Sequence, residues 1–378
     1  MRFLVPILLI TNCLPVTTEA ADDVFPLWEA SQPMLKAVDT PMLANVRFSQ
    51  IKQREPEVDG FTWLHGMAIV RHRGTLFTSW GHNKGKENTV TEIAQGRRSS
   101  DDGRTWGPVE LISDGGDKQA VSHGTFLSHD GVLWAFCGRF TGVRQNTGME
   151  AFVLNEKTNA WESRGVVAGE GFWPMEEPEK MDDGNWIMAG LQVGPGHPAA
   201  VAISHGDDFT HWDVIAIPQP KGINMWGESA VIVNGAEVLN IARYGGKAVA
   251  LASLSKDYGR SWSEMQESNL PMATSKPYAG ILSTGQRYLI GNTTAECGNT
   301  RDPLTIAVSR PGEKLFSKVW IIRRGQQEGF ADPKGTKLCY PYAAEYDGNL
   351  YVVYSVGHLP ANQNSGELAV IPLSELAW

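Results

Sequence analysis

The stretch Ser99-Ser100-Asp101-Asp102-Gly103-Arg104-Thr105-Trp106 decides the fold, because it returns as Ser255-Lys256-Asp257-Tyr258-Gly259-Arg260-Ser261-Trp262. Both have the pattern Ser-x-Asp-x-Gly-x-Thr/Ser-Trp and they start 156 residues apart, which is three times 52. An Asp that accepts backbone N–H groups, a Gly with positive φ and a Trp that packs between neighbours suit a tight hairpin. Weaker copies occur at 155–161, 204–212 and 309–316, and the aromatic residues that end the five copies are 50 to 55 residues apart. This period predicts one four-stranded propeller blade per repeat.

Six pairs of short β-type segments, each with a turn between its members, accompany the repeats. The pairs are 67–70 with 76–80, 125–128 with 133–137, 179–181 with 186–189, 230–233 with 237–242, 279–282 with 288–291, and 343–346 with 350–354. Six pairs predict an all-β, six-bladed β-propeller, a single domain from residue 21 to 378. Residues 22–60 have no repeat, and we expect them to supply the strand that closes the ring beside residues 368–373. A seventh, degenerate blade built from them is the alternative.

The first twenty residues have the organisation of a secretory signal peptide. Arg2 precedes an apolar run from residue 3 to 10, and small and polar residues lead to a predicted cleavage site after Ala20. The apolar run is much shorter than the roughly 20 residues that span a bilayer, so we expect no membrane span. The mature protein is therefore predicted to be secreted or periplasmic.

Charge and cysteine content narrow the classes of partner. The formal net charge is -9, and the chain has no basic run or zinc-type ligand spacing, so we expect no nucleic acid, no metal and no cofactor. Cleavage leaves Cys137, Cys297 and Cys339. At most one internal disulfide can form, and we expect it between Cys297 and Cys339, because the repeats place both at one end of neighbouring blades. We expect a monomer.

Polar and aromatic residues gather where each innermost strand begins and where each second strand ends. In a propeller these positions surround the axial mouth, where small molecules bind. The residues are His65, His82, Asn83, Glu87, His123, Arg139, Glu177, Gln192, Glu228, Arg243, Tyr278, Arg301, Tyr340, Tyr342 and His358. This mouth is the predicted binding site.

The complete eight-residue pattern resembles the Asp-box of sialidases and related propellers, over roughly residue 62 to the end. In that family the Asp-boxes lie on the face away from the pocket, so their residues are structural. Four pocket positions match the family in identity, order and blade: Glu228 in Trp-Gly-Glu-Ser, Arg243 in Ile-Ala-Arg-Tyr, Arg301 in Asn-Thr-Arg-Asp, and Tyr340 ten residues before Leu350. The resemblance implies a sialidase-like six-bladed propeller.

Two positions depart from the family. The first of three arginines that bind the sialic acid carboxylate belongs to an Arg-Ile-Pro sequence, where this chain has Leu64-His65-Gly66. The general acid of the family is an Asp in the loop before the first Asp-box, where Glu87 is the nearest carboxylate. The sugar is therefore predicted to be sialic acid or another carboxylated sugar, such as a uronate.

The resemblance implies a glycoside hydrolase that retains anomeric configuration. Tyr340 would be the nucleophile, Glu228 its base and Glu87 the acid that protonates the leaving oxygen. Arg243 and Arg301 would bind the substrate carboxylate. An ordinary explanation for Arg301 is an ion pair with Asp302 or Glu296.

Further residues complete the predicted site, and two other functions remain open. His65 is expected to bind a sugar hydroxyl or carboxylate beside the reacting centre, and the remaining substrate-binding candidates are Arg139, His123, Tyr342 and Gln192. One alternative is a polysaccharide lyase that cleaves uronates by β-elimination, with His65, His123, Tyr340 and Arg243 in its site. The other is a non-catalytic propeller that binds an acidic glycan.

Overall fold

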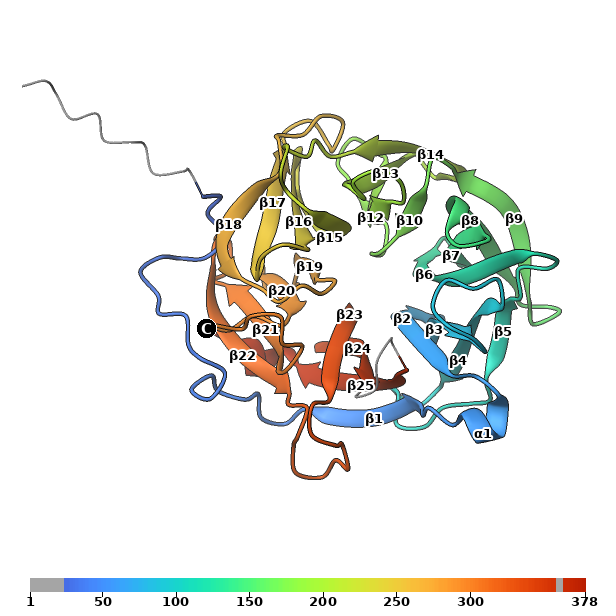
Figure 1. Cartoon of the computed structure of the whole chain (residues 1–378), viewed down its shortest axis with the longest axis horizontal. Coiled ribbons are helices and arrows are strands. Elements are labelled where there is room, and N and C mark those ends of the chain that lie inside the picture. The colour runs from blue at the N-terminus through green and yellow to red at the C-terminus, as the bar shows by residue number, and fades with distance from the viewer. Residues whose placement is uncertain (1–23, 358–362) are drawn as a thin grey trace, which may run out of the picture.

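The computed structural model describes residues 24–357 and 363–378. The described residues form six sheets that are arranged as the blades of a ring (Figure 1). The all-β, six-bladed β-propeller predicted from the repeat is therefore confirmed. The predicted signal peptide and His358 lie outside the described residues.

The blades follow one another in chain order. Blade 1 contains β2 (Trp63–His72), β3 (Thr75–Asn83), β4 (Glu92–Ser99) and β5 (Glu110–Ser113); blade 2 contains β6 (Gln119–His129), β7 (Val132–Thr141), β8 (Gln145–Asn155) and β9 (Ala160–Ala168). Blade 3 contains β10 (Phe172–Pro174), β11 (Glu179–Lys180), β12 (Trp186–Gln192), β13 (Ala199–His205) and β14 (Asp208–Ala216). Blade 4 contains β15 (Met225–Asn234), β16 (Glu237–Tyr244), β17 (Val249–Ser255) and β18 (Gln266–Pro271). Blade 5 contains β19 (Tyr278–Ile281), β20 (Arg287–Gly291), β21 (Leu304–Ser309) and β22 (Phe316–Arg323). Blade 6 contains β23 (Lys337–Tyr346), β24 (Asn349–Gly357), β25 (Ser365–Pro372) and β1 (Arg47–Lys52), while α1 (Pro56–Asp59) and the 3-10 helix η1 (Leu373–Leu376) are the described helices.

The ring closes as predicted, through a strand from the N-terminal region. β1 pairs with β25 in blade 6, so the outermost strand of the last blade comes from the start of the chain. Residues 24–46 run along the outside of the ring towards β1 (Figure 1) and touch blades 4 and 5 through isolated bridges such as Phe25 with Ser268 and Trp28 with Phe316. The alternative of a seventh blade is wrong, because these residues form single bridges and no sheet of their own.

The two complete Asp-boxes are hairpin turns whose polar groups bond to one another. The Ser99 hydroxyl donates to Asp101 at 2.7 Å and accepts the Gly103 amide at 2.8 Å. Asp101 also accepts the amide and the hydroxyl of Thr105, at 2.9 and 2.6 Å. Gly103 has a φ of 75°, and a Cβ there would collide with Leu368 of blade 6. The turn therefore needs glycine both for its conformation and for contact between blades.

The predicted disulfide is wrong, because Cys137, Cys297 and Cys339 are all free thiols. Cys339 is buried in β23, whereas Cys297 is half-buried in a turn closed by its amide bond to the Thr294 carbonyl. The repeat therefore placed both residues near one end of their blades without making the thiols face each other.

Within the described ranges, no helix has the length and apolar character needed to cross a membrane.

Candidate active site

β-bulges in the innermost strands direct the candidate residues into the axial mouth. The pairing register shifts between His65 and Ala68 in β2, between Val121 and Gly124 in β6, between Met225 and Ser229 in β15, and between Cys339 and Tyr342 in β23. His123, Glu228 and Tyr340 lie within these interruptions, and His65 is the last paired residue before the one in β2. A bulge re-aims side chains at the rim of a sheet, so the same irregularity in four blades builds one site.

Tyr340, Glu228 and Arg243 form the centre of the site. The Tyr340 hydroxyl donates to the Glu228 carboxylate, and the Arg243 guanidinium donates to Glu228 Oε2 at 2.5 Å and to Tyr340 Oη at 3.1 Å. Only 6% of Tyr340 and 7% of Glu228 are exposed to solvent. Strands of blades 4 and 6 therefore place a phenol, a carboxylate and a guanidinium in direct contact.

The two acidic groups of this centre have opposite pKa shifts. Burial, with the Glu228 charge beside it, raises the pKa of Tyr340 well above its ordinary value. Burial alone would also raise the pKa of Glu228, but Arg243 and the Tyr340 hydroxyl outweigh it and lower the pKa of that carboxyl. The centre thus holds a neutral phenol against an ionised carboxylate, which can accept the phenolic proton.

Arg301 lies beside this centre and faces the mouth. Its guanidinium carbon is 5.6 Å from the centre of the Tyr340 ring, and its Nη2 donates to the Thr274 carbonyl at 3.0 Å. The Thr274 hydroxyl also accepts the Nε of Arg243 at 3.0 Å, so one residue orients both guanidinium groups.

The expected ordinary partners of Arg301 are engaged elsewhere. Asp302 accepts the Gly325 amide at 2.7 Å, and Glu296 pairs with Lys36 at 3.0 Å. Among the described contacts of Arg301, neither carboxylate is an ion-pair partner, so its charge remains directed to the pocket.

Glu87 faces the same pocket from the loop between β3 and β4. Arg144 Nη2 is 3.3 Å from Glu87 Oε1, and Arg144 Nε donates to Asn88 at 2.6 Å. Burial raises the pKa of Glu87 above its ordinary value, and Arg144 only partly opposes this. The guanidinium of Arg144 lies 5.0 Å from the centre of the Trp226 ring, which holds it over the mouth.

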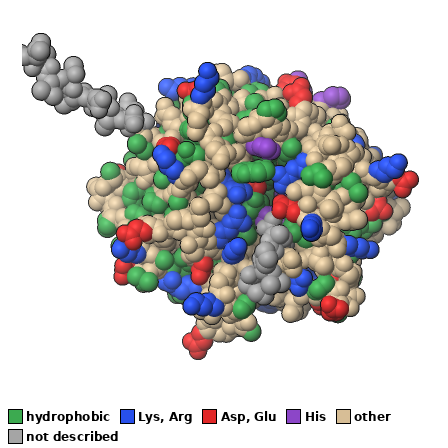
Figure 2. All heavy atoms as spheres, in the orientation of Figure 1, with side chains coloured by type: hydrophobic (Ala, Val, Ile, Leu, Met, Phe, Trp, Pro, Cys, Tyr) green, Lys and Arg blue, Asp and Glu red, His purple; other side chains and the backbone are tan. Residues whose placement is uncertain are grey.

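The mouth has two connected lobes. The outer basin has a volume of about 530 Å³ and is lined by Glu87, Asn88, Val143, Arg144, Trp226, Glu228, Arg243, Arg301 and Tyr340. The inner recess has a volume of about 30 Å³, room for a small group; it shares six of these residues and adds Trp63, His65, Glu92, Ser122, His123, Trp173, Met175, Leu191 and Val193. Figure 2 shows Lys and Arg side chains gathered around the central opening of the ring. The outer basin is therefore cationic, while the nine residues that line only the inner recess are apolar or neutral polar groups.

The structure brings seven of the ten predicted site residues to these lobes and places three elsewhere. Arg139 donates to Gln119, and Gln192 donates to the Glu170 carbonyl at 2.8 Å. Tyr342 is buried against Tyr278, with ring centres 4.6 Å apart. In the described part of the chain, these three side chains lie outside the walls of both lobes.

Several pocket residues have no sequence motif that could have identified them. Arg144 reaches the mouth from the turn between β7 and β8 and Trp226 from the start of β15, and Glu92 pairs with Ser122 of the next blade. Lys276 is buried below the centre, where its Nζ donates to the Pro341 carbonyl at 3.0 Å. Burial lowers the pKa of Lys276 to about 8, although Glu176 and Glu228 partly oppose this. The available signal for Lys276 was its position just before a predicted innermost strand.

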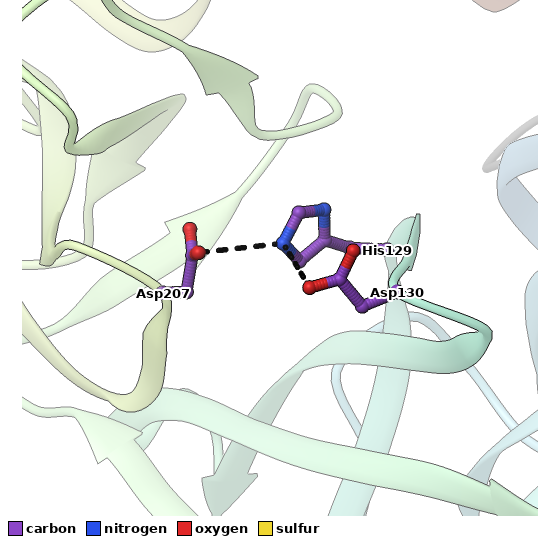
Figure 3. Close-up of side chains that lie close together, drawn as sticks. All are labelled: His129, Asp130 and Asp207. Atoms are coloured by element: carbon purple, nitrogen blue, oxygen red, sulfur yellow. Dashed lines mark ion pairs between the residues drawn. The ribbon is translucent and has the colours of Figure 1, made fainter.

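Residues with the chemistry of metal ligands meet at another place. His129, Asp130 and Asp207 have ligand-type atoms within 4.8 Å of one another, on hairpin turns of blades 2 and 3 (Figure 3). Asp207 already pairs with Lys180 at 2.5 Å and accepts the indole N–H of Trp186 at 2.8 Å. These contacts balance its charge within the protein, and we assign no metal there.

Comparison with solved structures supports the fold. A protein of unknown function from Dyadobacter fermentans DSM 18053 has a TM-score of 0.65 and 13% identity, over 87% of this chain and 99% of its own. The Hadza microbial sialidase Hz136 has a TM-score of 0.68 and 13% identity, over 86% and 68%. Trypanosoma rangeli sialidase has a TM-score of 0.66 and 13% identity, over 89% and 60%, so the match spans three-fifths of that enzyme. At this identity the likeness concerns the fold.

Comparison at the level of sequence gives the family. No curated protein sequence matches this chain. A family model described as a BNR repeat-like domain matches residues 74–352, which are most of the chain and include both complete Asp-boxes. The chain therefore belongs to the family of BNR repeat-like domains.

Proposed function

We propose that this protein is a glycoside hydrolase that removes a terminal acidic sugar, a sialic acid or another carboxylated sugar, from a glycan with retention of configuration. The observation that carries the proposal is the Tyr340 hydroxyl, which is bonded to Glu228 and to Arg243 at the base of a cationic pocket. The first twenty residues support export of the protein, so the glycan would be extracellular or periplasmic.

A tyrosine nucleophile suits a sugar that carries a carboxylate on its anomeric carbon. A carboxylate nucleophile would be repelled by that charge, whereas a phenol approaches without repulsion. Tyr340 passes its proton to Glu228 as its Oη attacks the anomeric carbon, and Glu87 gives its proton to the departing oxygen. In the second step Glu87 takes a proton from water, whose oxygen attacks the same carbon, and Tyr340 leaves and recovers its proton from Glu228.

The cationic groups of the outer basin give the substrate its orientation. Arg243 and Arg301 share Thr274 as a hydrogen-bond partner, which sets the two guanidinium groups side by side for one carboxylate. Arg144 lies on the opposite wall beside Glu87, where it limits how far the pKa of this acid rises.

The test is release of the fluorophore from a fluorogenic α-sialoside by the mature protein. Tyr340→Phe is expected to reduce kcat by about 10³-fold or more, because it removes the nucleophile. Tyr342→Phe is the matched control, since it lies two residues away on β23, outside both lobes, and is expected to keep wild-type kcat. Equal rates for the wild type and Tyr340→Phe would refute the assignment of the nucleophile.

A specific observation favours a lyase as the second candidate. The His65 ring lies 3.7 Å from the Tyr340 ring, and burial holds the pKa of His65 well below its ordinary value, so a neutral imidazole stands beside the phenol. Such a pair suits proton abstraction next to a uronate carboxylate that arginines neutralise. Hydrolysis adds one water to the product, whereas elimination leaves an unsaturated sugar that absorbs in the ultraviolet. Mass and absorbance of the products from a uronate-containing glycan separate the two, and binding without any product would favour a lectin.

A further inference from the structure

The inner recess contains three deeply buried side chains with unused hydrogen-bonding atoms. Glu92 is 1% exposed, His65 2% and His123 8%, and all three line the recess. Glu92 Oε2, His65 Nε2 and His123 Nε2 have no hydrogen-bond partner among the described residues. A buried polar atom without a partner costs free energy, so a wall with three such atoms is built for a ligand that pairs with them.

The neighbours of His65 determine which of its nitrogens carries the proton. The Asn364 amide nitrogen donates to the Leu64 carbonyl at 2.9 Å, which fixes the orientation of this amide. The same nitrogen lies 3.3 Å from His65 Nδ1, which must therefore accept. Burial, followed by the nearby His123 and Arg301, keeps the pKa of His65 low and its ring neutral. The proton is consequently on Nε2, and His65 presents a donor to the recess.

His123 presents the opposite polarity. The Ser122 hydroxyl donates its one proton to Glu92 Oε1, so its oxygen accepts from His123 Nδ1, 3.0 Å away. Burial lowers the pKa of His123 to about 3, so the ring is neutral and its Nε2 carries a lone pair. Burial also raises the pKa of Glu92 to about 8, and its proton then sits on the unpartnered Oε2 at neutral pH. These three groups thus offer an acceptor on His123 and donors on His65 and Glu92, and none of the three is charged.

We propose that the inner recess is a subsite for a hydroxyl group of the acidic sugar, which accepts from His65 Nε2–H and donates to His123 Nε2. The ring centres of the two histidines are 6.0 Å apart and both rings line the recess, so one hydroxyl at the edges of both rings can reach the two nitrogens. A carboxylate can only accept and would face the His123 lone pair, while an ammonium can only donate and would face the His65 proton. The assignment rests on the proposed function, in which Arg243 and Arg301 hold the sugar carboxylate in the outer basin.

The wall of the recess beside that hydroxyl is largely apolar. Trp63, Trp173 and Met175 line the same cavity, and the His123 ring lies 5.3 Å from the Trp173 ring. Gly66 is also required, because a Cβ there would overlap the His123 ring. Where the sialidase family has its first arginine, this chain has Leu64-His65-Gly66. His65 is a neutral donor at this position, and Gly66 leaves room for the His123 ring.

The experiment compares the loss of a ligand hydroxyl with the loss of His123. In a Tyr340→Phe background, which prevents turnover, the probes are the methyl α-glycoside of N-acetylneuraminic acid, methyl glucuronoside, and analogues of each that lack one hydroxyl. Affinity is measured by calorimetry and by quenching of tryptophan fluorescence. For one position we expect the deoxy analogue to bind about tenfold weaker than its parent. The same pair should bind with equal affinity to His123→Leu, whereas His123→Gln, which keeps an acceptor, should preserve the difference.

Each remaining outcome overturns the proposal in a recognisable way. If every deoxy analogue weakens by the same factor in both proteins, the recess does not bind a hydroxyl, although the proposed function stands. If neither methyl glycoside binds, either to the Tyr340→Phe protein or to the same protein with Arg301→Met added, the acidic-sugar function fails, and the subsite fails with it. If His123→Leu does not fold, Ser122→Ala replaces it. Without the Ser122 hydroxyl, His123 is no longer held in one tautomer, and the tenfold difference in affinity between parent and deoxy analogue should shrink to about threefold. An undiminished difference would contradict the donor and acceptor assignment.

Discussion

Opposite ends of β4 use similar polar residues for different purposes. At one end Ser99 donates to Asp101 in the first Asp-box, and at the other end Ser122 of the next blade donates to Glu92. The two ends are about 23 Å apart, from a rise of roughly 3.3 Å per strand residue. In the Asp-box, Asp101 is surrounded by donors, and hydrogen bonds from Thr105 and Ser99 lower its pKa. In the recess, Glu92 Oε2 lacks a partner among the described residues, and burial raises the pKa.

This difference separates structure from function more reliably than residue type does. A turn whose donors and acceptors bond to one another has no capacity left for a ligand, so its loss should affect stability alone. A pocket wall with unused buried atoms is less stable than it could be, and such sites are where proteins keep strain for function. Mutations at the two places should therefore have different kinds of effect.

Among changes to the groups around the nucleophile, Arg243→Met has the largest expected effect. It removes the cation that bonds to both Glu228 and Tyr340, so the pKa of Glu228 should rise and the substrate carboxylate should lose one of its two partners. We expect kcat/KM on the α-sialoside to fall by about 10³-fold. Arg139→Met is the matched control, because Arg139 contacts Gln119 outside both lobes and should keep nearly all activity. Similar losses in both variants would remove the distinction between pocket and scaffold.

A somewhat smaller effect is expected for Glu87→Gln, with a change in the pH profile. In the wild type Glu228 must be ionised, and its lowered pKa puts the acidic limb below the ordinary value of 4.5. Glu87 must be protonated, and its raised pKa puts the alkaline limb above that value. Glu87→Gln should lower kcat by about 10²-fold for a substrate with a poor leaving group and abolish the alkaline limb. An unchanged alkaline limb would exclude Glu87 as the acid.

Lys276→Met should have a more modest effect, through the position and charge of the centre. Lys276 donates to the carbonyl of Pro341, the residue after Tyr340. Tyr340 itself has a φ of 56°, which is unusual for a tyrosine. We expect kcat to fall by about tenfold with KM unchanged. Losing this buried cation should also raise the pKa of Glu228 and move the acidic limb to higher pH. Lys276→Arg should restore the limb. A change in KM alone would contradict this positioning role.

How much of this the sequence predicts depends on whether a feature is local. The Asp-box is local, because its Ser, Asp, Gly and Thr bond to one another within eight residues, and so its spacing predicted six blades and the closing strand. Tyr340 and Glu228 were identified by resemblance, as each begins an innermost strand. The pairing of Glu92 with Ser122 joins different blades, and no local pattern encodes it.

The same limit explains the incorrect and incomplete predictions. Cys297 and Cys339 share a blade end by repeat position, but the direction of each thiol depends on packing that the repeat does not specify. The neutral state of His65 follows from burial, which a rim position alone does not reveal. Bulges decide which residues face the mouth, and this chain has them in β2, β6, β15 and β23 without a common sequence.

The smallest expected effect sharpens the comparison between the ends of β4. Ser99→Ala removes a buried hydroxyl that donates to Asp101 and accepts the Gly103 amide, so the free energy of unfolding should fall by about 1–2 kcal/mol. Its kcat/KM should equal that of the wild type, because no atom of this turn faces either lobe in the described structure. Denaturant unfolding and the fluorogenic assay measure both quantities on the same sample. A loss of activity without a loss of stability would mean that the Asp-box end of β4 communicates with the pocket, and satisfied hydrogen bonds would then no longer distinguish scaffold from site.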